Sequence, residues 1–303
     1  MENTLHILNG DSSKLKFEQS RIKGTATVWR DVLSDGPVSI DFASPDFWQS
    51  RKTFFSSFFG VISLRYEQDV IAEFKKIQKF NAYDEVVLWF EYDLFCQINL
   101  IALLHWFKNQ EIKAPKISLI CVGWEEGFEG LVGLGEIPTD DYPSLYERRR
   151  ILGSNDFNLA SDAYLAYCSE DPRDLETFIL LPSNEFPYLG LAFMAHLKRF
   201  PSSKTGFNVI EEKIMELINE GNTNLKSLIR ELLKWQHLFG FGDLQYLKYL
   251  ENLKPIFKDF ENLELKRDFD SSMIKRDYYL GGANASDWLW DDELQEIKLK
   301  AHS

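Results

Sequence analysis

The sequence predicts an α/β protein with a Rossmann-like parallel sheet in its N-terminal domain, followed by a mainly helical C-terminal region with a winged-helix-like module. Two observations predict this class. Short apolar runs of strand length alternate with helical patterns over roughly the first 125 residues, which is typical of a parallel sheet with right-handed crossovers. From about residue 140 onward, strand-like runs almost disappear and helical patterns take their place.

The expected strands are four short runs in which β-branched, aromatic and leucine side chains follow one another, residues 4–9, 25–30, 85–90 and 116–122. Their length suits buried strands, and their nearly continuous apolar character suits a parallel sheet that is covered on both faces. We therefore expect all four to belong to one sheet.

The expected helices of this half are residues 13–22, 45–58, 66–80 and 94–109. Asp11 or Ser12 can cap the first of them and Asp93 the last, because short polar side chains satisfy free N–H groups at a helix start. In residues 94–109, apolar side chains recur at four-residue spacing, which predicts a helix that packs against the sheet.

The second half divides at polar and glycine-rich stretches. We predict an α/β ligand-crevice domain over residues 1–139, a helical connecting region over 140–204 and a winged-helix-like module over 205–303. The module is predicted because three helical stretches over 208–254 precede two strand-like runs, "ENLELKRDF" and "IKRDYYLGG".

Composition limits the function. The chain has 303 residues, a net charge of −13, 45% hydrophobic and 15% aromatic residues, so it is globular and its average field repels nucleic acid and anionic membranes. The longest apolar stretch, residues 94–107, is shorter than the roughly 20 residues of a membrane span. The start resembles no secretory signal, and the dispersed Cys96, Cys121 and Cys168 suit buried free thiols, so we expect a cytoplasmic protein with no membrane partner.

Polar side chains gather where the expected strands end. They are Asn9, Gly10, Asp11 and Ser12; Arg30 and Asp31; and Glu91 and Asp93. Because the carboxyl ends of parallel strands meet at one edge, where ligands bind, these residues are predicted to share a crevice. Gln97 lies one helical turn after Asp93 and faces the same way. "GLVGLGEI", residues 130–137, lacks the spacing of a dinucleotide cradle and is expected to be a loop.

The residue types indicate chemistry. Asp11, Glu91 and Asp93 are candidate catalytic residues, as acid and base or as ligands of a divalent metal. Arg30 and Arg51 can neutralise an anionic ligand, while Asn9, Gly10, Ser12, Asp31 and Gln97 can orient it. The prediction is a small-molecule partner that is nucleotide-like or phosphorylated, bound or turned over by a metal-assisted hydrolase or transferase. Alternatively, Asp11, Ser12 and Asp93 are ordinary helix caps, and Arg30 and Asp31 are only a surface pair.

Several motifs together resemble a bacterial family, domain of unknown function eighteen thirty-five. They are "LHILNGDS", "VWRDVLSDGPV", "VVLWFEYDLFCQINLIALL", "AYCSEDP", "HLKRFPSSKTGFNVIEEKIMELI" and "YYLGGA". The resemblance implies an α/β N-terminal domain followed by a helical region, and no established activity. The family commonly shows His-Asp where this chain has Tyr92-Asp93, and Asp-Gln where it has Cys96-Gln97, so a mechanism that needs that histidine is not implied here.

A second hypothesis is a transcriptional regulator that senses a metabolite and binds DNA through the winged-helix-like module. Its third helix, over residues 243–253, carries Asp243 and Glu251 against one Lys248. Because a helix in the major groove gains affinity from Lys and Arg, nucleic acid is not the expected partner. The oligomeric state is left open.

Overall fold

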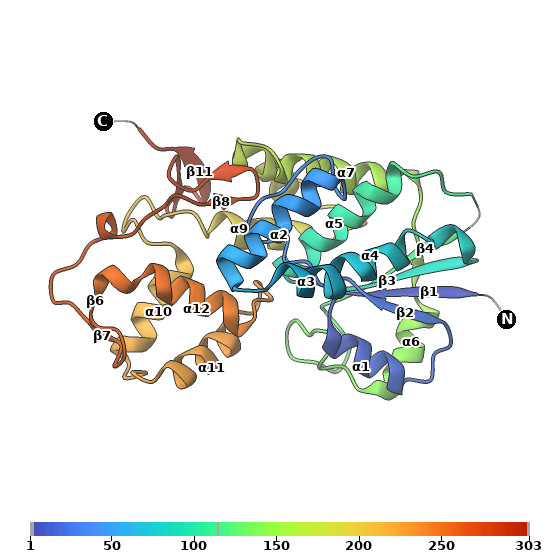
Figure 1. Cartoon of the computed structure of the whole chain (residues 1–303), viewed down its shortest axis with the longest axis horizontal. Helices are drawn as coiled ribbons and strands as arrows, with labels where there is room; N and C mark the ends of the chain where they lie inside the picture. The colour runs from blue at the N-terminus through green and yellow to red at the C-terminus, as the bar shows by residue number, and fades with distance from the viewer. Residues whose placement is uncertain (1–2, 114, 302–303) are drawn as a thin grey trace.

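The computed structural model describes residues 3–113 and 115–301. A five-stranded sheet of order β2-β1-β3-β4-β5 lies in the right-hand part of the view in Figure 1. The strands are β1 (Thr4–Leu8), β2 (Thr25–Val28), β3 (Glu85–Glu91), β4 (Lys116–Val122) and β5 (Arg150–Ile151). The first four are parallel and β5 runs antiparallel to β4. The predicted mixed α/β class and the four predicted strands are confirmed.

The sheet is covered on both faces because successive side chains of each strand point to opposite sides. Val86 and Leu88 belong to the larger apolar core, while Val87 and Trp89 belong to a smaller one. The larger core packs under α2 (Pro45–Phe59), α4 (Ala72–Ile77), α5 (Leu94–Lys108) and α7 (Ser154–Tyr167). The smaller packs under α1 (Asp11–Gln19) and α6 (Tyr142–Glu147), on the lower side in Figure 1.

The helix starts in this half follow the capping chemistry only in part. Asp93 caps α5, because its carboxylate accepts the backbone N–H of Cys96 at 2.7 Å. The predicted cap of the first helix is wrong: α1 starts two residues earlier, with Gly10 at the cap position and no side-chain cap. Residues 63–77, expected as one helix over 66–80, form α3 (Ser63–Tyr66), a π-helical turn (Glu67–Ile71) and α4.

The remaining helices are α8 (Glu176–Leu180), α9 (Leu189–Leu197), α10 (Val209–Asn219), α11 (Leu225–Trp235) and α12 (Asp243–Asn252). The larger core continues from the sheet through Ile210 and Leu250 to Trp290 and Ile297. Buried ion pairs join distant segments, Arg199 with Asp35 among them. Among the described residues, no helix combines the length and the apolar character that crossing a bilayer requires.

The two strand-like runs expected to form the wing lie in separate hairpins. The run around β7 (Glu264–Leu265) pairs with β6 (Phe257–Asp259), and the run around β8 (Tyr279–Leu280) pairs with β9 (Ala283–Asn284). Each run finds its partner in a neighbouring hairpin, so the two runs do not pair with each other. The short β5 and the hairpin of β10 (Trp288–Asp291) and β11 (Glu296–Leu299) were not predicted.

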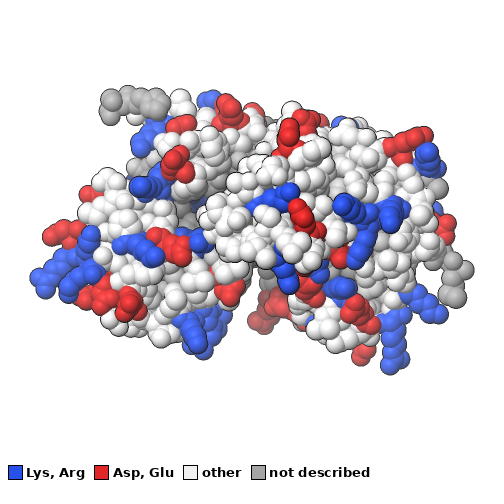
Figure 2. All heavy atoms as spheres, in the orientation of Figure 1, with Lys and Arg blue, Asp and Glu red and all other residues white. Residues whose placement is uncertain are grey.

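Charge on α10–α12 is largely neutralised within single helical turns. Lys213 pairs with Glu216, Lys234 with Glu231, and Lys248 with Glu251. Acidic and basic side chains are interspersed over this part of the face in Figure 2. These ion pairs favour the expectation that nucleic acid is not a partner, and that expectation stays a prediction.

Candidate functional site at the carboxyl edge of the sheet

The candidate site lies where β3 ends and α5 begins. Glu91 is the last residue of β3, Asp93 caps α5, and Cys96 lies in its first turn. One ligand atom from each of these three side chains lies within 4.8 Å of the others. The end of β3 and the start of α5 thus bring two carboxylates and a thiol to one point.

A chain of amide hydrogen bonds holds the thiol of Cys96. Asn99 donates to Asn9 Oδ1 at 2.9 Å, and Asn9 donates to Cys96 Sγ at 2.9 Å. Cys96 in turn hydrogen bonds with Asp93. Asn9 was predicted from the end of β1, and the structure shows that it connects the ends of β1 and β3.

Burial disfavours the charged forms of this cluster. Burial, and next the charge of Asp93, raise the pKa of Glu91 to about 8, and burial raises the pKa of Asp93 to about 6. Burial also raises the pKa of the Cys96 thiol. At neutral pH the cluster therefore favours either a retained proton or a bound cation.

A loop over residues 123–137 forms the outer wall of the site. Its Val132, Leu134 and Ile137 are buried in the smaller core. A Cβ on Gly133 would lie 2.5 Å from the Glu91 carboxylate, and one on Gly135 would lie 3.0 Å from Ser12 Oγ. Residues 130–137 are a loop, as predicted. The sequence did not show that these glycines let the backbone approach two predicted site residues at once.

Gln97 contacts the backbone of Glu91. Its amide nitrogen donates to the backbone carbonyl of Glu91 at 2.6 Å. Its Oε1 is buried and, among the described residues, has no hydrogen-bond partner. An unpaired buried acceptor is costly, so a proton donor or a cation at this position would stabilise it.

The N-terminus of α5 has no N–H left for an anion. Leu94 N donates to the carbonyl of Leu238 at 2.8 Å and Phe95 N to that of Phe239 at 3.2 Å. The next N–H, of Cys96, donates to Asp93. The C-terminal helical region thus closes this helix start.

The N-terminus of α1 is open by comparison. Gly10 takes φ 149°, a value that favours glycine, and turns the chain from β1 into the helix. Among the described residues, the backbone N–H groups of Asp11, Ser12 and Ser13 have no acceptor. Free N–H groups at a helix start attract anions.

The other predicted charged residues separate into two pairs. Arg30 forms a bidentate pair with Asp11, at 2.9 and 2.7 Å, and the Asp11 side chain remains 69% exposed. This pair lies at the open start of α1, and the hydrogen bond to Arg30 lowers the pKa of Asp11. Asp31 and Arg51 are both fully buried and bind each other at 2.6 Å. They are out of reach of a ligand, so the proposed site excludes them.

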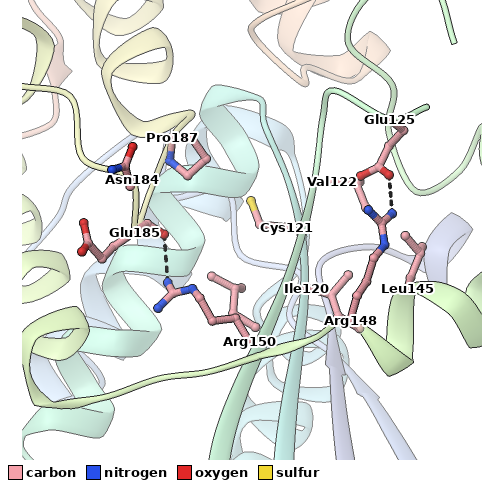
Figure 3. A pocket seen from close by; sticks show the side chains of 11 residues that line it. Ile120, Cys121, Val122, Glu125, Leu145, Arg148, Arg150, Asn184, Glu185 and Pro187 are labelled. Atoms are coloured by element: carbon pink, nitrogen blue, oxygen red, sulfur yellow. Dashed lines mark hydrogen bonds and ion pairs between the residues drawn. The ribbon is translucent and has the colours of Figure 1, made fainter. Parts of the chain in front are cut away.

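A small pocket of about 210 Å³ lies on the outer side of β4. Figure 3 shows Arg150 reaching the backbone carbonyl of Glu185 and Arg148 paired with Glu125. Cys121 lines this pocket, and its Sγ also lies 3.4 Å from the Gln97 amide nitrogen. Both arginines are engaged by the protein, so we place the ligand crevice on the Glu91 side of Gln97.

Gly240 closes the site from the C-terminal region. Its φ is +66°, and a Cβ there would overlap the Asp93 carboxyl group. We expect Gly240→Ala to lower the free energy of unfolding by about 1–2 kcal/mol in urea titrations, because both the backbone and the carboxylate must shift. Gly242→Ala is the matched control, since a Cβ there meets nothing within 4 Å. Equal effects of the two substitutions would show that Gly240 does not press on Asp93.

Neither a scan against protein-family models nor a search among curated proteins gave a match for this chain. The functional conclusion therefore rests on the geometry of the site.

Proposed function

We propose that this protein binds a divalent cation through Glu91 and Asp93, with Cys96 as a third ligand. In this proposal the cation and the start of α1 together hold a nucleotide-like or phosphorylated small molecule. The observation that carries the proposal is the cluster itself, in which three potential ligand atoms lie within 4.8 Å on groups whose pKa values burial has raised. Kinship with the family that the motifs resemble stays part of the proposal.

The donor set favours a transition-type metal. Carboxylates accept Mg²⁺, Mn²⁺ and Zn²⁺, whereas a thiolate selects Zn²⁺ over Mg²⁺. The unpaired Oε1 of Gln97, close to the Glu91 backbone, supplies a further acceptor in the same region. A cation at this point also offsets the repulsion between the Glu91 and Asp93 carboxylates, which disfavours the ionisation of both at once.

The phosphate would lie at the start of α1. The free N–H groups of residues 11–13 supply donors there. Arg30, whose guanidinium donates to Asp11 and to the Asp69 carbonyl, adds positive charge beside them. The loop carrying Gly133 and Gly135 contacts both Glu91 and Ser12, so the two halves of the crevice lie beside the same short segment. Ser12 would orient the ligand there, while the Asn9 amide stays bound to Asn99 and Cys96.

The chemistry supported by this arrangement is hydrolysis or group transfer at a phosphoryl centre. A bound divalent cation polarises a phosphoryl oxygen and neutralises charge that develops there. Glu91 holds a proton at neutral pH in the absence of a cation and releases it on binding, because its pKa is raised to about 8.

Titration calorimetry with Zn²⁺, Mn²⁺ and Mg²⁺ tests the cation site. We expect wild-type protein to bind one Zn²⁺ and to release protons, with an affinity that rises between pH 6.5 and 8. Glu91→Gln and Asp93→Asn should each weaken binding at least tenfold, about 1.4 kcal/mol. The control is Glu126→Gln, an exposed carboxylate on the same outer loop. Unchanged affinity in both site variants would refute the proposal.

The phosphate-binding part of the proposed site, at the start of α1, is tested separately with Zn²⁺-loaded protein. Inorganic phosphate and a nucleoside monophosphate should raise the melting temperature of wild type, and Arg30→Gln should remove most of this rise while Zn²⁺ affinity stays unchanged. Loss of Zn²⁺ affinity in Arg30→Gln would show that Arg30 belongs to the cation site instead.

A further inference from the structure

A large pocket lies away from the proposed cation site, between the two halves of the chain. Its volume is about 780 Å³, within the range of roughly 300–1,000 Å³ that small-molecule sites occupy. Four segments form most of its wall: residues 35–38 after β2, the last turns of α2, one face of α12, and residues 275–282. Cys168, Glu170 and Arg199 complete it. The Gly36-Pro37 turn and the "YYLGG" run, both parts of motifs quoted above, meet here.

Aromatic rings dominate the wall. Phe54 and Phe58 of α2 are stacked with centroids 4.9 Å apart. Tyr249, Tyr278 and Tyr279 add three more rings. Gly36 allows this packing, because a Cβ there would lie 2.6 Å from the Phe54 ring. Rings from α2, α12 and residues 278–279 in one wall favour a flat, aromatic occupant.

The charges around the pocket balance. Its cations are Lys248, Lys275 and Arg199, and its acids are Asp35, Glu170 and Asp277. Arg199 is buried and pairs with Asp35, and Lys248 pairs with Glu251 at 2.7 Å. Because the wall has no excess of either sign, it gives a charged ligand no net attraction.

The hydroxyl of Tyr249 has a hydrogen-bond donor to spare. Tyr249 lines the pocket, and its hydroxyl accepts the Nε–H of Arg199 at 3.1 Å. Among the described residues, the Tyr249 O–H donates to no acceptor. A hydroxyl donor held in place in a mostly apolar pocket orients a ligand that carries a hydrogen-bond acceptor.

We propose that this pocket is a second binding site, which takes an uncharged, planar aromatic small molecule with one hydrogen-bond acceptor. The proposal does not depend on the cation site. It assigns the apolar contacts to Phe54 and Phe58 and the directional contact to Tyr249.

N-phenyl-1-naphthylamine, an uncharged dye that fluoresces in apolar surroundings, is the probe. The full-length protein should bind one dye molecule, and Phe58→Ala should weaken binding about tenfold. Phe128→Ala is the control, because this exposed ring lies outside the pocket wall. Val38→Trp, which fills the pocket, should abolish binding. If that variant does not fold, Phe58→Ala still decides the question, because Phe58 is only half-buried.

Competition between quinoline and naphthalene tests the donor. The two are nearly isosteric and uncharged at pH 8, and quinoline alone has an acceptor. Quinoline should displace the dye at about tenfold lower concentration, and Tyr249→Phe should abolish this preference while naphthalene binding is unchanged. Dye binding that is insensitive to Phe58→Ala, or equally weakened by Phe128→Ala, would overturn the site. Preferred, salt-dependent binding of anilinonaphthalene sulfonate would overturn the uncharged ligand class.

Discussion

Replacing Arg51 with methionine is expected to lower the free energy of unfolding by about 3–5 kcal/mol. Arg51 is fully buried and donates to Asp31, to the carbonyls of Val32 and Asp35 and to that of Pro37. Its loss removes the counter-charge of a buried carboxylate and one donor from each of three carbonyls, while methionine replaces only the apolar part of the side chain. Asp31 still accepts from the Tyr66 hydroxyl and the Val32 N–H, and the Val32 carbonyl from the Asp35 N–H. The effect is large because the partners stay behind in a dry interior.

Urea unfolding followed by far-UV circular dichroism measures this loss. Arg65→Met is the matched control, because Arg65 is 67% exposed and its pair with Asp69 lies within one helical segment, so a change below about 0.5 kcal/mol is expected. Combining Arg51→Met with Asp31→Asn should recover part of the stability, since the unpaired charge is then gone. A loss below 1 kcal/mol in Arg51→Met would show that Asp31 has another means of compensation.

The second large effect is on the pH dependence of stability. Burial raises the pKa of Glu91 to about 8, so the folded protein binds a proton that the unfolded chain has already released. Stability therefore falls as pH rises toward and through pH 8. Between pH 6.5 and 8.5 we expect a loss of about 2 kcal/mol from this group. Burial lowers the pKa of His6, His105 and His196, so near pH 6.5 only the unfolded chain takes up protons on them. This effect opposes that of Glu91 and is the same in wild type and in a Glu91 variant.

Urea titrations at pH 6.5, 7.5 and 8.5 compare wild type with Glu91→Gln. The variant should lose less stability over this interval than wild type does, and the gap between the two should widen by about 2 kcal/mol. Glu126→Gln should follow wild type. Parallel curves for wild type and Glu91→Gln would mean that Glu91 is ionised and stabilised in the folded protein, contrary to the burial of its carboxylate.

The sequence predicted those parts of the fold that depend on local pattern. The run "EVVLWF" could only be a buried strand or helix, and its length and the Asp93 cap after it identified both β3 and α5. Glu91, Asp93, Asn9 and Gln97 were predicted at one sheet edge because parallel strands impose a common edge. The structure brings Glu91 and Asp93 together and connects Asn9 to them through Cys96.

The rest depended on partners that lie far away in sequence. Cys96 was predicted as a buried free thiol, which is confirmed. Its place beside Asp93 follows from the three-residue spacing of the two residues at the start of a helix, and this spacing alone predicts the contact. Arg30 and Asp31 are adjacent, yet one pairs with Asp11 at the surface and the other with Arg51 in the core. No local pattern fixes the direction of a side chain after a strand ends.

The two hydrogen bonds from Leu94 and Phe95 to residues 238 and 239 also set an order for biosynthesis. These partners are separated by 144 residues of chain. At a synthesis rate of roughly 5–20 residues per second, the acceptor carbonyls emerge about 7–30 s after the helix start that they cover. During this interval the nascent sheet can assemble, but the Asp93 carboxylate still faces water and keeps an ordinary acidity. The proposed cation site is thus completed late in translation, and a ribosome that stalls before residue 238 releases a chain that lacks the acceptors covering the start of α5.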